Sequence, residues 1–479
     1  MNIGMNAAVQ ALLAAQRALD VSGHNVANAN TPGYSRQRID LEPSAPFGSS
    51  GLHSRPAGPG QVGTGVTITQ IKRIRDQFID RQVRAESSPL GESRITADTM
   101  RQIEDIFGEP SDRSLGTLMG RFWDSWHALT THPEDASHRA NLTEVSVNLA
   151  NVFQEINGKL ESLRQDVNDR IQTTVEDVNS ITTRIADLNR QIKAGIATGQ
   201  NPNDLMDRRD TLLDDLSQKV QIHVVEVPST GALNVYLQGQ PLVDQEKAFP
   251  LAAQPILVTG FFQVDYPQTG EPANIAGGEL KGLLDARNQL LSDANAGGFI
   301  YEINQLASSM MTEINAVHRT GFGLDGTTGL DFFFGTNATD IEVNPAIAQV
   351  TGGTILIAAA SNDPGSLAGG PGDSGNAVRM AQLRNARVMN GNRFTFDDTY
   401  KGMLVSAGTQ GQEAMRQLST QEALLATVKE RREQTSGVST DEEMANVIKF
   451  QKAYAAAARI LTTIDEMLER LMTVGVVGR

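Results

Sequence analysis

The 479-residue sequence contains no cysteine, which excludes a disulfide framework, a thiolate metal site and a cysteine nucleophile. It has no run of 18 apolar residues, so no membrane-spanning helix is expected. Basic residues are in the minority, 41 against 56 acidic ones, and the net charge is −15. Such a surface repels phosphate backbones and anionic lipids, and we therefore expect neither nucleic acid nor a membrane as a partner.

The stretch from Met1 to Gln10 lacks the basic region and the long apolar region of a cleavable signal peptide. If the protein leaves the cytoplasm, we expect it to use an export route that does not read such a signal.

The last forty residues carry apolar side chains at alternating spacings of three and four. The positions are Val447, Phe450, Tyr454, Ala457, Leu461, Ile464, Leu468 and Leu471. This is the a/d pattern of a helix that lies along another helix. Ser439, Thr440 and Asp441 precede the pattern and supply a start signal for the helix.

The first thirty residues show the same spacing, interrupted only by the polar Ser22. The apolar positions after Met1 are Met5, Ala8, Leu12, Ala15, Leu19 and Val26. Because leaving such stripes in water is unfavourable, the two ends are predicted to meet in one helical element. Two interpretations remain open: a coiled coil within the chain that needs no partner, or a surface for further copies. Alanines on several faces of both segments favour the second, because small side chains allow more than one neighbour to approach closely.

A turn motif follows the first predicted helix. Its residues are Asn25, Asn28, Asn30, Thr31, Pro32, Gly33 and Tyr34. Pro32 presets φ at the second turn position and Gly33 allows a positive φ at the third, which predicts a type II turn. The asparagines can cap the carbonyls at the helix end.

The fold class predicted for the whole chain is mainly α with a smaller β part (α+β). We expect helices near 76–85, 92–107, 115–129, 136–194, 204–219, 278–319 and 409–434, strands near 35–41 and 65–71, and a hairpin over 220–237. The length indicates two or three domains. The predicted division is a terminal helical domain (1–42 and 438–479), an elongated helical domain (43–219 and 277–437), a small β subdomain (220–276) and a loop-rich segment (320–376).

No pattern supports catalysis, and no catalytic, metal-binding or cofactor-binding residue is predicted. Gly372-Asp373-Ser374-Gly375 resembles a protease nucleophile motif, but no histidine has a supporting context. The glycines of 321–326 follow a predicted helix rather than a strand, so a dinucleotide site is not expected. The many carboxylates stand beside Lys and Arg, which predicts ordinary solvent-exposed helix surfaces.

Residues 11–41 closely resemble the N-terminal signature of the bacterial flagellar axial family, which comprises rod, hook and hook-associated proteins. The motif from Asn25 to Tyr34 carries most of the resemblance, and residues 443–472 look like the C-terminal helix of that family. Three further segments favour the hook-associated members: 35–37, 76–82 and 282–287. The region after Thr320 is too short for the large outer β domain of some relatives, so none is expected.

The resemblance implies a secreted, self-assembling structural protein at the junction between the flagellar hook and filament. The implied partners are copies of the chain in a ring, the hook protein on one side, a second junction protein on the other, an export chaperone and the flagellar type III export apparatus. Another axial protein of hook or distal rod is the first alternative. A cytosolic coiled-coil scaffold or an enzyme is the second.

Overall fold

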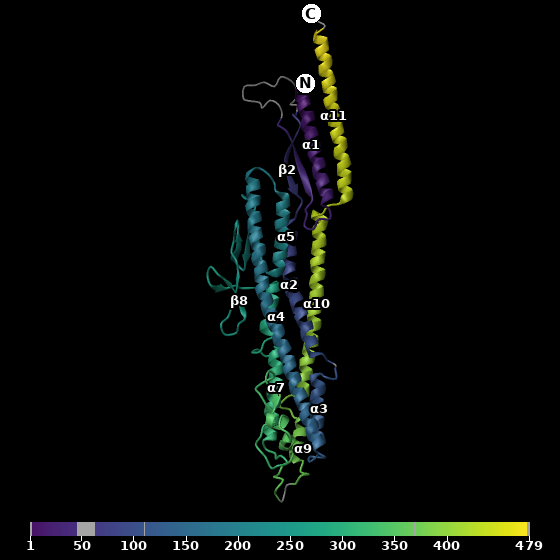
Figure 1. Ribbon diagram of the computed structural model, residues 1–479. Helices are drawn as coiled ribbons and strands as arrows, with labels where there is room; N and C mark the ends of the chain where they lie inside the picture. The colour runs from purple at the N-terminus through teal and green to yellow at the C-terminus, as the bar shows by residue number, and fades with distance from the viewer. Residues whose placement is uncertain (1, 46–62, 110, 367–369, 477–479) are drawn as a thin grey trace.

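The computed structural model describes residues 2–45, 63–109, 111–366 and 370–476, and shows an elongated molecule with both chain ends at the same end (Figure 1). Long helices run along it and small sheets lie beside them, which confirms the mainly α class with a β part. No helix in these ranges is both long and apolar enough to cross a membrane.

The terminal end is built from two helices and a ribbon. Its elements are α1 (Asn2–Ala27), β1 (Gln37–Pro43), β2 (Val66–Arg73) and α11 (Thr440–Val476). The strands pair antiparallel with a bulge after Asp40. Helix α1 lies between the ribbon and α11, and β2 therefore packs with the terminal helices although the predicted division placed its residues in the helical domain.

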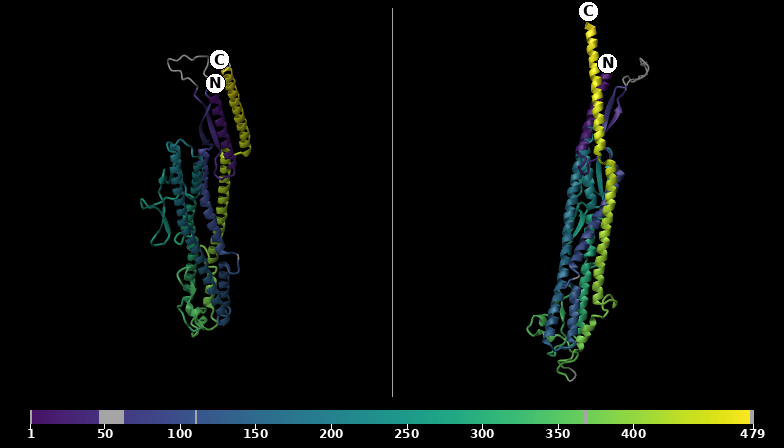
Figure 2. Two further views of the ribbon diagram at one scale, coloured as in Figure 1. Left: turned by 45° about the horizontal axis from the view of Figure 1, so that its top comes forward. Right: turned by 90° about the vertical axis from the view of Figure 1, so that its right-hand side faces the viewer.

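A rod of helices forms the body of the molecule (Figure 2). They are α2 (Gln77–Phe107), α3 (Leu115–Leu129), α4 (Ala136–Ala197), α5 (Asn203–Lys219), α6 (Glu279–Asp285), α7 (Phe299–His318) and α10 (Phe396–Ser436). With 62 residues, α4 extends about 93 Å at the usual 1.5 Å per residue. Its inward positions, among them Ile171, Val178 and Ile185, are fully buried.

Three elements differ from the prediction. The helix expected over 409–434 begins earlier, as α10 at Phe396, where Thr395 and Asp398 form a capping box. The helices expected over 76–85 and 92–107 are one helix, α2, which continues through Pro89. The proline is tolerated because α2 is packed along its length: Leu90 is buried, and a side chain at Gly91 would overlap the Gln218 carbonyl of α5. The helix expected over 278–319 is interrupted after α6 by a π-helical turn, η1 (Ala286–Leu290), and resumes at Phe299.

The β subdomain comprises a sheet of order β3-β4-β5-β6 and a sheet of order β7-β8-β9. The strands are β3 (His223–Val227), β4 (Ala232–Leu237), β5 (Gln240–Asp244), β6 (Lys247–Ala248), β7 (Ala252–Pro255), β8 (Phe262–Tyr266) and β9 (Glu271–Pro272). Three asparagines of α4 bond this subdomain to the rod. Asn168 accepts from the Phe262 amide, Asn179 bonds both backbone groups of Leu251, and Asn189 bonds both of Leu233. Spacings of 11 and 10 place the asparagines on one side of α4, three turns apart.

The far end of the rod holds the segment predicted to be loop-rich. Its elements are β10 (Phe333–Phe334), β11 (Glu342–Val343), α8 (Pro345–Ala348), the 3₁₀ turn η2 (Gly353–Leu356) and, after it, α9 (Gly375–Leu383). Trp123 and Trp126 of α3 are buried against aromatic rings of this end, including Phe396 and Phe332.

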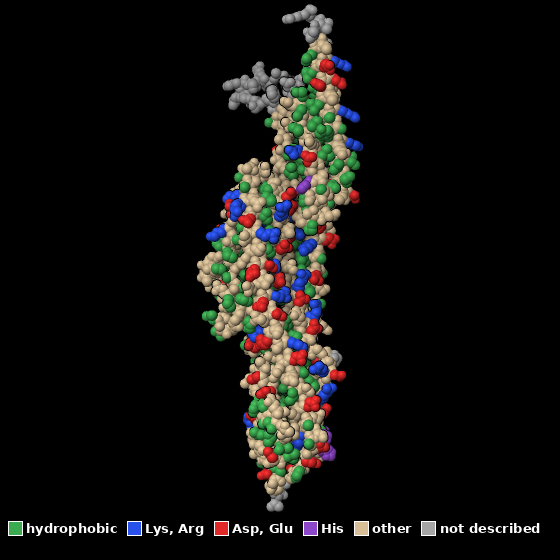
Figure 3. All heavy atoms as spheres, in the orientation of Figure 1, with side chains coloured by type: hydrophobic (Ala, Val, Ile, Leu, Met, Phe, Trp, Pro, Cys, Tyr) green, Lys and Arg blue, Asp and Glu red, His purple; other side chains and the backbone are tan. Residues whose placement is uncertain are grey.

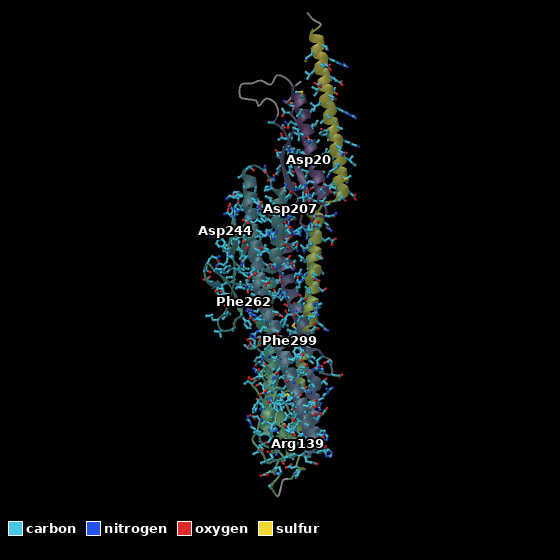
Figure 4. The ribbon with its side chains drawn as sticks, in the orientation of Figure 1. Asp20, Arg139, Asp207, Asp244, Phe262 and Phe299 are labelled. Carbon is cyan, nitrogen blue, oxygen red and sulfur yellow. The ribbon has the colours of Figure 1, made fainter. Side chains whose placement is uncertain are left out.

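Two buried basic side chains tie the loops of this end together. Arg139 donates to the carbonyls of Pro133, Thr354 and Ile357, and burial lowers its pKa to about 10. His318 bonds the Leu330 carbonyl through Nδ1 and accepts from the Ala358 amide through Nε2. Figure 4 labels Arg139 at this end, opposite to the chain termini.

Candidate assembly surface and domain junction

Helices α1 and α11 lie side by side and run in opposite directions (Figure 1). Near the start of α1, Gly4 lies beside Ile464, and near its end Asn25 bonds Glu443. Their contact line thus covers most of α1, while the C-terminal part of α11 extends past it. The apolar stripes of the two ends therefore face each other within a single chain.

The predicted seam of α11 faces α1. Ala457 is 4% exposed, Val447, Phe450, Leu461, Ile464 and Leu468 are half-buried, and Tyr454 is 38% exposed. Leu471 lies in α11, but its side chain is outside the described part of the chain. Apart from Asn25 and Glu443, the buried residues of this helix pair are mostly small, which allows close approach of the two backbones.

The seam of α1 is rotated from its predicted position. Ala8 and Ala15 are buried as expected, but Leu12, Leu19 and Val26 are only half-buried and Met5 is 37% exposed. The buried stripe instead includes further small residues and one amide: Ala14, Ala18, Val21 and Asn25. Alanines rather than leucines form the close contact, because α1 must fit between the ribbon and α11.

Other faces of the same two helices remain apolar and open to solvent. On α1 they carry Val9 and Leu13, and on α11 Met444, Ile448, Ile460 and Met467, each between 38% and 55% exposed. Figure 3 shows hydrophobic side chains gathered over these helices, whereas charges of both signs cover the rod below. The seam prediction missed these residues, although Val9, Met444, Ile460 and Met467 occupy the e and g positions that flank the seam, with Leu13 and Ile448 at b positions.

The motif turn has the expected geometry. The Tyr34 amide donates to the Thr31 carbonyl at 3.2 Å, and Gly33 has φ of +79°. Asn28 caps the His24 carbonyl, while Asn30 and Pro32 are exposed. A side chain at Gly33 would overlap the Thr211 hydroxyl of α5, so the turn packs directly against the rod.

Asn25 connects the terminal helices to the ribbon. Its Oδ1 accepts from the Gln37 amide and the Tyr34 hydroxyl, and its Nδ2 donates to the Gln37 carbonyl and to Glu443. Glu443 is 2% exposed and is paired with Arg36, whose amide bonds the Ser436 carbonyl at the end of α10. One asparagine thus holds α1, β1 and the start of α11 in a common arrangement.

A buried charge cluster lies just below this point, where the ribbon meets the rod. Four arginines, from β2, the β2–α2 connection, α2 and α10, alternate with four aspartates from α2 and α5: Arg73, Arg75, Arg84, Arg432, Asp80, Asp207, Asp210 and Asp214. The side chains are between 7% and 17% exposed. Figure 4 labels Asp207 in this region.

The charge cluster corrects the expectation that the carboxylates decorate solvent-exposed helix faces. Asp207, Asp210 and Asp214 stand at spacings of three and four on α5 and face the rod interior. Burial opposes the ionisation of Asp210, but Arg75, Arg73 and Arg84 outweigh it and hold the pKa of that carboxyl well below its usual range. Burial, with the Asp204 carboxylate next in effect, raises the pKa of Tyr34, which therefore keeps its proton and donates to Asn25.

This arrangement fixes the angle between the terminal helix pair and the rod. Among the described residues, no group of three or more His, Asp or Glu side chains is placed to hold a metal ion. Asp373, from the protease-like tetrapeptide, is used to bond the backbone of Ser361, Asn362 and Gly375. The residues around Asn25 and the charge cluster join the terminal helices to the rod, and an exposed apolar surface lies beside this contact.

Comparisons with known proteins point to one family. A family model described as the helical domain of the flagellar hook-associated protein FlgK matches residues 100–333. Models of the C-terminal part of the flagellar basal body rod FlgEFG proteins and of the flagella basal body rod proteins match residues 430–474 and 5–34. The match thus extends over both ends and the first half of the rod.

Relatives that align over the full length of the chain point to the same family. Flagellar hook-associated protein 1 of Bacillus subtilis is 31% identical over 504 residues, covering 100% of this chain and 99% of the relative. The protein of the same name from Salmonella typhimurium is 25% identical, covering 98% and 99%. The solved flagellar hook junction protein FlgK of Burkholderia pseudomallei has the same fold, with a TM-score of 0.63 at 17% identity over 74% of this chain and 100% of that one.

Proposed function

The chain belongs to the family of flagellar hook-associated protein 1, and from this premise we propose that it is a structural protein of the flagellum that joins filament to hook. The family membership over the full length carries this proposal. The open apolar faces of α1 and α11 support it, because they offer a surface for further subunits at the end of the molecule where both termini lie.

In this role, the terminal helices of neighbouring copies pack together in a ring, and the exposed positions of α11 become buried between subunits. Burying each large apolar side chain contributes about 1.5–3 kcal/mol, so a few such contacts per copy stabilise the ring. The hook protein and a second junction protein contact the ring on its two sides. Before assembly, an export chaperone covers the same apolar positions while the type III apparatus receives the chain.

The junction of Asn25, Glu443 and the charge cluster sets how each rod leaves the ring. Because the cluster is buried and paired on all sides, the angle is held firmly rather than left to a flexible linker. A single well-defined angle is what a symmetric ring of identical subunits requires.

Electron microscopy of a strain lacking the gene tests the proposal. We expect complete hooks that carry no filaments, and the protein in flagella purified from the parent strain. Loss of the hook itself would identify a hook or distal rod protein instead. Confinement of the protein to the cytosol would identify a cytosolic scaffold or enzyme and overturn the proposal.

Truncation tests the role of the ends. Removing residues 1–40 or 440–479 is expected to leave a soluble rod with native helical content that no longer enters flagella. Cooperative unfolding of the rod in those variants, seen by circular dichroism, would show that the ends belong to the rod's own core.

A further inference from the structure

The turn between β7 and β8 projects apolar side chains into solvent. Leu257 is 102% exposed and Val258 92%, with Ile256 beside them at 39%. No residue from Ala248 to Val264 carries a charge. We call Ile256, Leu257 and Val258 the knob. Large apolar side chains in this degree of exposure, on a segment free of charge, are typical of a contact with another protein.

The knob is held in a fixed position. Within the turn, the Ile256 amide donates to the Phe261 carbonyl at 2.9 Å and the Gly260 amide to the Ile256 carbonyl at 2.8 Å. The Arg164 guanidinium of α4 lies 4.4 Å from the Phe261 ring centre, and Asn168 accepts from the next amide, that of Phe262. A knob held in this way loses little conformational entropy on binding.

A groove between α2 and α4 offers apolar side chains that an apolar knob can contact. Its volume is about 590 Å³, and its lining combines the apolar side chains of Ile106 and Leu163 with polar residues such as Asp105 and Lys159. Gly158 is exposed at this groove, and a side chain added there would meet nothing within 4 Å. Apolar side chains surrounded by polar ones are the usual composition of a protein interface.

The knob and the groove lie at the same height along the rod but on different sides of α4. Arg164, which holds the base of the knob, falls within the groove-lining span 154–166 of the same helix. At about 100° per residue, the groove residues Glu155, Ser162 and Asp166 point about 120–160° away from the direction of Asn168. This placement allows the knob of one copy to face the groove of a copy that stands beside it.

We propose that the knob of one copy inserts into the α2–α4 groove of the neighbouring copy, a head-to-tail contact repeated around the ring. The inference rests on the proposed function, because it needs copies that stand side by side. It adds a second contact between subunits, midway along the rod and apart from the terminal helices, with a second copy of this chain as the partner.

The cysteine-free sequence allows a direct test by cross-linking. Leu257→Cys and Gly158→Cys are combined in one chain, the strain is grown, and purified flagella are treated with a mild oxidant. Because the two positions lie on different sides of α4, we expect bonds between copies: a ladder of dimers and larger species on a non-reducing gel. The single variants and the pair Gln268→Cys with Gly158→Cys, which uses the exposed neighbouring turn, should give no ladder.

The outcomes separate the two proposals. A ladder confined to the knob–groove pair supports the contact. Incorporation into flagella without a ladder, or with an equal ladder from the Gln268→Cys pair, overturns the contact and leaves the junction role standing. Absence of the parent protein from flagella overturns both.

A second variant covers failure of the cysteine pair to assemble. Leu257→Asp with Val258→Asp should leave the melting temperature unchanged, since both side chains are in solvent, yet clearly lower the fraction of cells with attached filaments. Gln268→Asp should change neither quantity. Normal filament attachment with Leu257→Asp and Val258→Asp would overturn the contact.

Discussion

The rod and the terminal helix pair are built on the same apolar spacing but reach different burial. In α4, Ile171 and Ile185 are 0% exposed, whereas in α11 Leu461 and Ile464 are half-buried and Met467 is 55% exposed. The cause is the number of neighbours: α4 has helices and the β subdomain around it, while α11 has α1 alone along most of its length. Equal periodicity therefore predicts pairing of helices but not a completed core.

The two regions should differ most in the loss of unfolding free energy that one substitution causes. Trp126→Ala removes a fully buried ring among other aromatic rings of the rod and should cost about 3–5 kcal/mol. Ile460→Ala, at 52% exposure on α11, should change the stability of the purified monomer by less than about 0.5 kcal/mol. Chemical denaturation followed by circular dichroism measures both. Equal losses would remove the distinction between the two regions.

The charge cluster offers the next largest effect. Asp210→Asn leaves three arginines facing a neutral amide in a buried site, so we expect a loss of about 3–5 kcal/mol. Asp187→Asn, whose partner Arg190 is mostly in solvent, is the matched control and should have almost no effect. Thermal melting curves of the two variants measure the loss. An unaltered melting temperature in Asp210→Asn would show that the ion pairs of the cluster do not stabilise the fold.

Acid should weaken the far end of the rod through His318. Burial lowers its pKa to about 4, below the 6.5 or so expected in the unfolded chain, so the unfolded state binds the proton first as the pH falls. The stability supplied by neutral His318 is complete above about pH 6.5 and is lost towards pH 4, with about 2 kcal/mol gone at pH 5. The measurement is the free energy of unfolding at pH 7.5 and pH 5 for the wild type and for His318→Gln. The pH-dependent loss should be smaller in the variant by that amount, and identical losses would contradict the assignment.

The smallest effect concerns the motif turn. Gly33→Ala forces a side chain into a positive φ and against Thr211, and should cost about 1–2 kcal/mol. Gly239 has a similar φ of +90°, but a side chain added there would meet nothing within 4 Å. The stability lost in Gly239→Ala therefore measures the cost of the positive φ alone. If the contact matters, Thr211→Ala should restore part of the stability lost in Gly33→Ala but none of that lost in Gly239→Ala. Additive losses in this double-mutant cycle would argue against the contact.

Much of the fold was predictable because local signals mark helices well. Residues 115–129 form a helix with the expected bounds, since Ser114 caps its start and apolar residues recur along one face. The start of α4 at Ala136 was also expected. Local signals failed at Pro89, where contacts of α2 with α5 and α10 outweigh the proline.

The junction was less predictable, because its partners are far apart in sequence. Asn25 and Glu443 bond across 418 positions, and Arg73 meets Asp210 across 137. The turn motif identified Asn25 as important but assigned it a capping role, which Asn28 fulfils instead. The aspartates of α5 could have been noticed from their spacing of three and four in a helix that also carries apolar residues.

Hydrogen exchange of the purified full-length monomer tests most directly whether neighbours complete the terminal helix pair. The account predicts fast exchange along α1 and along α11 from Ile448 to Met467, slow exchange in the middle of α4, and protection of both ends in purified flagella. Ends as well protected as α4 in the monomer would contradict it, because the pair would then be complete without further copies.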